Sequence, residues 1–221
     1  MTLRLWLPAS IVLLWGILAL LSPLLSLNPN AIDLTNILTP PGPTEWLGYD
    51  ELGRPMADRL AMGAKTSFLA SLAVVLLGVT VGGLLGAASG HLTGWVGYAR
   101  LARAQVLSIK QADHVLAAKA IGASTWRILV RHLLPLLTAP LIVEASFGIA
   151  GAIIAEAGLS FLGLGGQPPE ASWGSMIRDG PRYMLVAPHL VIIPGLTLML
   201  VVLAANLLGD WLRDWLDVKD R

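Results

Sequence analysis

Apolar residues dominate four stretches of the chain, and each stretch is long enough to cross a membrane as a helix. The stretches comprise residues 5–27, 67–88, 133–157 and 184–208. About 20 helical residues span a hydrocarbon core of about 30 Å, and a helix satisfies its own backbone hydrogen bonds in lipid. The pattern predicts an all-α, polytopic helical membrane protein with about four transmembrane helices, in which residues 1–221 form a single transmembrane domain.

The composition supports a membrane protein and excludes several other classes. Hydrophobic residues make up 55% of the 221 positions and charged residues only 13%, against about a quarter charged in soluble domains. The chain has no cysteine, which excludes disulfides, thiolate metal sites and a cysteine nucleophile. The first apolar stretch is too long for the apolar region of a signal peptide, so we favour a retained anchor over the alternative of a cleaved signal.

The charges between the apolar stretches predict the topology. Residues 28–66 are Pro-rich and carry five acids against three bases, so we expect an external loop there. Residues 89–132 hold six Lys or Arg residues and one acid, and such an excess marks a cytoplasmic loop. Within it, residues 95–109 predict an amphipathic helix at the cytoplasmic interface or the inner end of an incomplete span. Residues 158–183 then form a second external loop, which places both termini in the cytoplasm.

The basic loop contains a short segment suited to docking. Ala117, Ala118 and Gly122 have small side chains, so a partner can approach the backbone closely. Val115 and Leu116 add a short mixed surface of the kind that fits a groove on a soluble protein, and Gly122 permits a turn before a second helix. The alternative is an ordinary surface loop whose alanines merely favour a helix.

The spacing of these residues resembles a known motif. Ala117-Ala118, then Gly122, then Leu134-Pro135 resemble the EAA loop of permease subunits of binding-protein-dependent ABC transporters. In that family the loop forms a coupling helix seated in a cleft of the ATP-binding subunit. Leu116 stands where the namesake Glu of the motif would be, which removes one charge from the expected contact. The resemblance implies an ATPase-coupling segment formed by Ala117, Ala118, Lys119, Gly122, Ala123, Ser124 and Pro135.

Three further segments are similar to the branch of this family that carries dipeptides, oligopeptides and nickel. They comprise residues 46–68, 155–177 and 206–217. Pro55 replaces an acidic residue that commonly follows Gly-Arg in the first of them, so we expect a different local turn there.

The resemblance is interrupted after the second apolar stretch. In the family two further spans follow, whereas here residues 90–94 run directly into a segment similar to the one beyond those spans. The chain therefore resembles a permease that lacks two central spans. Because spans lost as a pair preserve the topology, the coupling loop stays cytoplasmic.

The resemblance implies a permease subunit of an ATP-driven importer for peptides, nickel or similar small solutes, in a bacterial-type inner membrane. Such a subunit is not an enzyme and needs no cofactor, because partner subunits bind and hydrolyse ATP. The implied partners are ABC ATP-binding subunits, a second homologous permease, an extracytoplasmic solute-binding protein and membrane lipid, with no nucleic acid. Two alternatives stay open: an ATPase-binding scaffold or remnant without transport, and a secondary transporter that works without ATP.

Two acidic residues and a Gly-rich run are the remaining candidates for a role in the pathway. Glu144 and Glu156 lie in the third apolar stretch, where a charge in lipid is costly, so each should face protein or water. Their separation of about 18 Å along a helix excludes a paired catalytic site. We favour structural roles for both, with Glu156 accepting from backbone donors, while a substrate contact of Glu144 stays open. Gly163 and Gly165 predict an irregular connection. It shapes the external end of the pathway or the landing site for a binding protein, or it simply links two spans.

Histidine and tryptophan positions complete the sequence predictions. The four histidines lack metal-ligand spacing, so we predict no metal site. Trp46 and Trp173 should lie in the outer interfacial belt.

Overall fold

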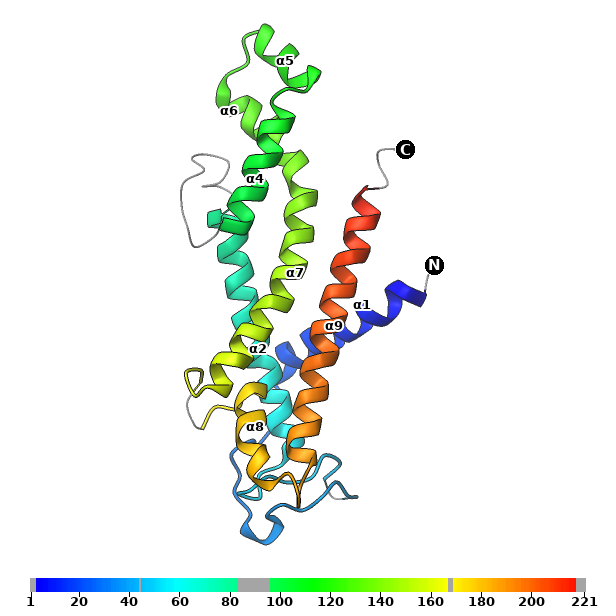
Figure 1. Ribbon diagram of the computed structural model, residues 1–221, viewed down its shortest axis with the longest axis vertical. Helices are drawn as coiled ribbons and strands as arrows, with labels where there is room; N and C mark the ends of the chain where they lie inside the picture. The colour runs from blue at the N-terminus through cyan, green and yellow to red at the C-terminus, as the bar shows by residue number, and fades with distance from the viewer. Residues whose placement is uncertain (1–2, 44, 83–95, 167–168, 218–221) are drawn as a thin grey trace. The chain divides into compact units, whose positions relative to one another are not determined.

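The computed structural model describes residues 3–43, 45–82, 96–166 and 169–217. Within these ranges the regular structure is helical, and the only strand-like pairing is a single antiparallel bridge between Tyr49 and Pro55. The all-α prediction is confirmed (Figure 1). The helices are α1 (Leu3–Leu21), the 3-10 helix η1 (Leu34–Asn36), α2 (Met56–Leu77), the π-helix η2 (Gly78–Gly82), α4 (Val96–Ile109), α5 (Asp113–Ala120), α6 (Thr125–Ile128), the π-helix η3 (Leu129–Leu133), α7 (Leu134–Phe161), α8 (Trp173–Asp179), the 3-10 helix η4 (Gly180–Tyr183) and α9 (His189–Asp217).

In the described part of the chain, three helical runs are long and apolar enough to cross a membrane. They are Met56–Val81, Thr125–Phe161 and His189–Leu216. The first predicted span is shorter than expected. Helix α1 ends at Leu21 rather than near residue 27, and its apolar part, Trp6–Leu21, is shorter than the three runs above. Pro23 explains this early end, because a proline disfavours the helical conformation of the residue before it.

The other helix boundaries also differ from the predicted spans. Helix α2 begins at Met56, well before residue 67, and Asp58 in its first turn stabilises the positive end of the helix dipole. Helix α9 begins at His189 rather than at residue 184, because Met184–Pro188 form a turn. The predicted amphipathic helix is α4, with Val96–Ile109 helical. Trp95 and the junction at residues 90–94 lie outside the described residues.

The chain divides into two compact units, each with its own apolar core. The first unit comprises Met1–Leu72 and Ile149–Leu208, and the second comprises Ala73–Gly148 and Gly209–Arg221. The core of the first unit contains Trp15, Met56, Ala64, Ile153, Trp173, Met176, Ala187, Leu190 and Val201. The core of the second unit contains Val106, Val115, Ala118, Ile128, Leu133 and Leu137.

Candidate functional site

The predicted coupling segment is a helical hairpin formed by α5 and α6 (Figure 1). Gly122 ends α5 in the left-handed conformation, with φ of 81°. Its N–H donates to the carbonyl of Lys119 and the N–H of Ala123 donates to that of Ala118, each at 3.0 Å. This pair of bonds is a Schellman motif, in which glycine is strongly preferred. The predicted turn at Gly122 is therefore confirmed.

Ser124 opens the second helix of the hairpin. Its backbone is extended, and its side-chain oxygen accepts a hydrogen bond from the N–H of Arg127 at 3.3 Å. This contact satisfies one of the free N–H groups at the helix start. Gly122 and Ser124 thus stop one helix and start the next within three residues, which defines the tip of the hairpin.

A small apolar core holds the hairpin together. Val115 is fully buried and Ala118 is 7% exposed, and both belong to the cluster that includes Ile128 and Leu137. The sequence prediction that Val115 lies on a docking surface is therefore wrong, and Ala118 also faces inward. The reason is that residues three apart share one face of a helix, and this face packs against the rest of the hairpin.

The outer surface of the hairpin carries large apolar side chains that the sequence reasoning did not single out. Ile121 is 86% exposed and Trp126 72% exposed, and Leu116 is about half exposed. Ala117 and Lys119 of α5 are also exposed, outside the hairpin core. The sequence did contain a feature that indicates this surface: bulky apolar residues stand beside a glycine turn within a basic loop. Together Leu116, Ala117, Ile121 and Trp126 form what we call the tip surface.

Pro135 lies where the hairpin continues into α7. The helical run extends from Thr125 to Phe161 and includes the π-helical turn Leu129–Leu133 directly before α7. A proline inside a helix removes one backbone hydrogen bond and crowds the carbonyl four residues earlier. For Pro135 that carbonyl belongs to Arg131, within the π-helical turn. Pro135 itself is exposed, and its carbonyl accepts from Thr138 Oγ1 at 2.7 Å.

Glu156 links two helices of the first unit. Its Oε2 accepts from Ser67 Oγ of α2 and its Oε1 accepts from Ser160 Oγ of α7, both at 2.8 Å. Ser67 and Ser160 are buried. The structural acceptor role is as expected, but the donors are side-chain hydroxyls rather than the predicted backbone N–H groups, because backbone N–H groups inside a helix already bond to carbonyls.

Glu144 lies in the second unit and is half-buried. Its backbone carbonyl is 3.5 Å from the hydroxyl of Tyr98, which donates to it. The Tyr98 ring packs closely over Gly78 and Gly148, where an added Cβ would collide with it. Tyr98 therefore joins α4 to η2 and α7 within this unit.

Gly163 and Gly165 shape the end of α7. Gly163 has φ of 81°, and the N–H groups of Gly163 and Leu164 donate to the carbonyls of Ser160 and Leu159 at 3.1 and 2.8 Å. This is a second Schellman motif. At Gly165 a Cβ would lie 2.8 Å from the Cα of Ser160, so the backbone contact excludes any side chain.

Helix α8 follows this irregular connection and is seated firmly in the first unit. Trp173 is 1% exposed, and its Nε1 donates to the carbonyl of Leu60 at 3.0 Å. Ser172 and Ser175 form a reciprocal capping box at the start of α8. The prediction that Trp173 lies in an interfacial belt is wrong, because its ring fills the space above Gly63, whereas Trp46 is 84% exposed.

Two of the histidines approach each other in the second unit. The rings of His114 and His132 have centroids 6.1 Å apart. Within the described residues, no group of three or more potential metal-binding side chains occurs. His91 lies outside those residues, and the absence of a metal site remains a prediction.

Comparison with known proteins identifies the family. Residues 61–219 match the model of the family described as "Binding-protein-dependent transport system inner membrane component". The chain belongs to this family. The matched range contains the hairpin, Glu144, Glu156 and α8, so the permease resemblance found in the sequence is confirmed.

Curated relatives of this inner membrane component cover most of the chain. The "Probable D,D-dipeptide transport system permease protein DdpC" of Escherichia coli (strain K12) is 36% identical over 256 residues, covering 96% of this chain and 86% of the relative. The "Glutathione transport system permease protein GsiD" of Pectobacterium atrosepticum is 35% identical over 234 residues, covering 86% of this chain and 78% of the relative. GsiD of Escherichia coli O1:K1 / APEC is likewise 35% identical.

The alignment with the first relative is longer than this inner membrane component itself. It runs over 256 residues, whereas the chain has 221. The aligned part of the relative therefore contains residues that this chain lacks, as the interrupted sequence resemblance predicts.

Proposed function

We propose that this inner membrane component is the permease subunit of an ATP-driven importer of short peptides, of the size of a dipeptide or glutathione. The named functions of its relatives support the substrate class. ATP is bound and hydrolysed by separate subunits, so the chain itself performs no covalent chemistry and holds no cofactor. A second homologous permease completes the pathway, and a solute-binding protein delivers the peptide to the side where α8 lies.

The observation that carries this proposal is the tip surface. Ile121 and Trp126 are large apolar side chains that stand almost fully in solvent, and exposed apolar clusters of this kind mark protein interfaces. Exposed Lys119 and Arg127 flank them, which gives the surface a basic rim. A cleft of an ATP-binding subunit that is apolar inside and acidic at its edge fits this surface.

Two features of the hairpin allow it to transmit a force to α7. Its two helices share a buried core, and the helical run that begins at Thr125 continues to Phe161 over 37 residues. At about 1.5 Å per residue this run is about 55 Å long. Closure of the ATP-binding subunits against the tip surface therefore moves α7, and with it the access of the pathway to either side.

Co-purification with the ATP-binding subunit tests the docking step. We expect Ile121→Asp combined with Trp126→Ala to reduce the bound ATPase at least tenfold, because buried aromatic and apolar anchors contribute about 2 kcal/mol or more to such interfaces. Leu185→Asp is the matched control, since Leu185 is also fully exposed but belongs to the connection before α9. Equal ATPase binding by both variants would contradict docking at the tip surface.

Uptake and labelling experiments test the remaining parts. Proteoliposomes that contain the complete complex should accumulate a labelled dipeptide only when ATP and the solute-binding protein are present. Bound ATPase without any uptake would support the scaffold alternative instead.

Cysteine labelling tests the topology. The natural absence of cysteine allows Ser124→Cys and Leu185→Cys to be labelled selectively. We expect labelling of position 124 from the cytoplasm and of position 185 from outside, and the opposite result would reverse the proposed topology with cytoplasmic termini.

A further inference from the structure

Glu144 lies near the centre of a membrane-spanning helix. It belongs to α7, Leu134–Phe161, and the apolar stretch around it comprises residues 133–157. At about 1.5 Å per residue, Glu144 is about 17 Å from one end of that stretch and about 20 Å from the other. A carboxylate at this depth is costly unless protein, water or a ligand surrounds it. Its surroundings therefore decide what Glu144 does.

The carboxylate of Glu144 has no partner in the part of the chain that the structure describes. The residue is half-buried, and its hydrogen bond with Tyr98 is made by its backbone carbonyl, not by its side chain. The nearest hydroxyl along α7 is engaged elsewhere, because Ser146 Oγ donates to the carbonyl of Val143 at 2.7 Å. Among the described residues, no hydrogen bond or ion pair reaches the Glu144 carboxylate.

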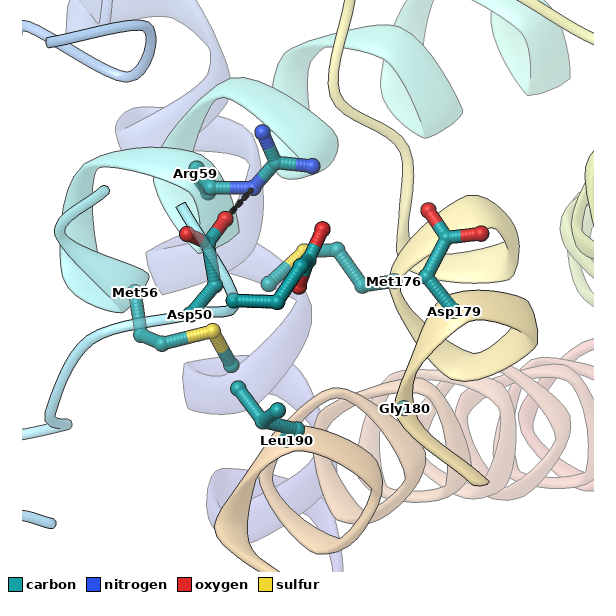
Figure 2. Close-up of a pocket in the computed structure, with 8 residues that line it drawn as sticks. Asp50, Met56, Arg59, Met176, Asp179, Gly180 and Leu190 are labelled. Carbon is teal, nitrogen blue, oxygen red and sulfur yellow. Dashed lines mark ion pairs between the residues drawn. The ribbon is translucent and has the colours of Figure 1, made fainter. Parts of the chain in front are cut away.

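Two other acidic side chains show how carboxylates away from solvent are normally accommodated in this chain. Asp50 is 3% exposed and forms an ion pair with Arg59, whose Nε lies 3.4 Å from Asp50 Oδ2 (Figure 2). Glu156, on the same helix as Glu144, accepts hydrogen bonds from two hydroxyl groups at 2.8 Å. Since buried polar groups of folded proteins are nearly always paired, the open acceptor oxygens of Glu144 indicate a partner from outside the described chain.

Tyr98 lies directly beside Glu144 in the second unit. Gly148 is one turn further along α7 and shares a face with Glu144, and a Cβ at Gly148 would collide with the hydroxyl of Tyr98. That hydroxyl donates to the Glu144 carbonyl at 3.5 Å, and its oxygen can still accept a hydrogen bond. Tyr98 is half-buried, as Glu144 is. A carboxylate, a phenolic oxygen and an aromatic ring therefore lie close together.

These three groups suit an ammonium ion. A carboxylate in surroundings of low dielectric constant attracts a cation strongly, and an ammonium group can donate to both oxygens and be attracted to the aromatic ring. A hard divalent metal ion takes about six oxygen ligands or more, whereas the described ranges contain no group of three or more potential metal-binding side chains. A single organic ammonium group needs only one carboxylate to balance its charge.

We propose that Glu144 binds the N-terminal ammonium group of the transported peptide at the centre of the membrane, with Tyr98 as a second contact. Glu144 repels the C-terminal carboxylate of the peptide, which therefore points away from it. The site selects solutes with an unmodified amino group after the solute-binding protein has delivered them. It rests on the proposed function in the choice of a short peptide as the solute.

Binding of a dipeptide to the full transporter complex tests this site in the absence of the solute-binding protein. The probes are L-alanyl-L-alanine and its N-acetyl derivative, which keeps the carboxylate but lacks the ammonium group, and binding is followed by saturation-transfer NMR. We expect the acetylated form to bind at least about tenfold more weakly, because hydrogen bonds to charged groups are the stronger ones. Ethylammonium should compete with the dipeptide, and acetate should not.

Three variants and one control assign the effect. Glu144→Gln should remove the preference for the free amine, and Glu144→Asp should keep part of it, because the charge is retained on a shorter side chain. Tyr98→Phe should weaken binding of the free dipeptide about threefold, since it removes the hydroxyl but keeps the ring. Glu156→Gln is the matched control, because Glu156 lies on the same helix but is bonded to two hydroxyls. It should lower the melting temperature and leave the preference unchanged.

The outcomes separate this proposal from the proposed function. Equal binding of the two probes by the unmodified complex, or binding of neither, would overturn the ammonium site even if ATP drives peptide uptake. A preference that persists in folded Glu144→Gln would overturn it as well, and so would loss of the second permease from that variant, which would assign the carboxylate to a subunit contact. If the preference depends on Glu144 but ATP drives no uptake, the ammonium site stands and the proposed function fails.

Discussion

Replacement of Gly63 by alanine should destabilise the protein although alanine is the better helix former. Gly63 lies in α2 beneath the ring of Trp173, where a Cβ would lie 2.6 Å from Cδ1, 2.9 Å from Nε1 and 3.2 Å from the backbone nitrogen of that residue. The indole cannot move aside freely, because it is buried and its Nε1 donates to the carbonyl of Leu60.

Two opposing effects set the magnitude. Alanine in place of glycine inside a helix stabilises by about 1 kcal/mol, whereas an extra carbon in a filled core costs about 1–3 kcal/mol. We therefore expect Gly63→Ala to lower the free energy of unfolding by about 1 kcal/mol. Gly151→Ala in α7 is the matched control, because a Cβ there meets no atom of the described part of the chain within 4 Å, and it should stabilise by up to about 1 kcal/mol.

Reversible unfolding of the detergent-solubilised chain in sodium dodecyl sulfate, followed by tryptophan fluorescence, measures both changes. The two variants should shift the unfolding midpoint in opposite directions. Trp173→Leu should remove most of the effect of Gly63→Ala, since the smaller side chain leaves room for the new methyl group. Equal stabilisation by Gly63→Ala and Gly151→Ala would refute the assigned position of Trp173 above α2.

Three further predictions concern the hairpin, the buried carboxylate and the loop before α2. Gly122→Ala should destabilise the hairpin by about 1 kcal/mol through its left-handed backbone alone, and Gly122→Asn by less; equal amide exchange in both variants would contradict this. Ser67→Ala should lower the free energy of unfolding by about 1 kcal/mol, and by less in a Glu156→Ala background, whereas additive effects would argue against their hydrogen bond. The hydrogen bond from the Thr35 hydroxyl lowers the pKa of Asp33, so the turn it caps is stabilised above the ordinary carboxyl pKa and weakens as the pH falls. A protection factor of the Thr35 amide, taken relative to its intrinsic exchange rate, that does not change with pH would refute this.

Helix position and the hairpin turn could be predicted because both depend on local physics. Long apolar runs must be helical in lipid wherever they occur, and the left-handed turn that glycine favours was predicted at Gly122 and is observed there. The helix ends were less predictable. The charged start of α2 resembled a loop, although Met56 is buried in the core of its unit and the helix begins there.

The environments of Trp173 and Glu156 could not be predicted, because they depend on contacts between residues that are distant in the sequence. Tryptophan is a typical residue of membrane interfaces, yet Trp173 is buried because Gly63, which has no Cβ, leaves space for its ring. Glu156 meets Ser67 across 89 positions of the chain. No periodicity or motif indicates such pairs, since each partner is chosen by how two helices pack.

The sequence by itself determined that this protein is a helical membrane component with a basic, turn-containing segment, because hydrophobic length, charge and glycine geometry act locally. Only the tertiary structure decided which face of the hairpin is exposed: Val115 and Ala118 turn inward, and Ile121 and Trp126 remain in solvent. It also left Nη1 of Arg59 buried and, within the described residues, without a hydrogen-bond partner. Burial depends on what packs against each side chain, and that is a property of the folded chain.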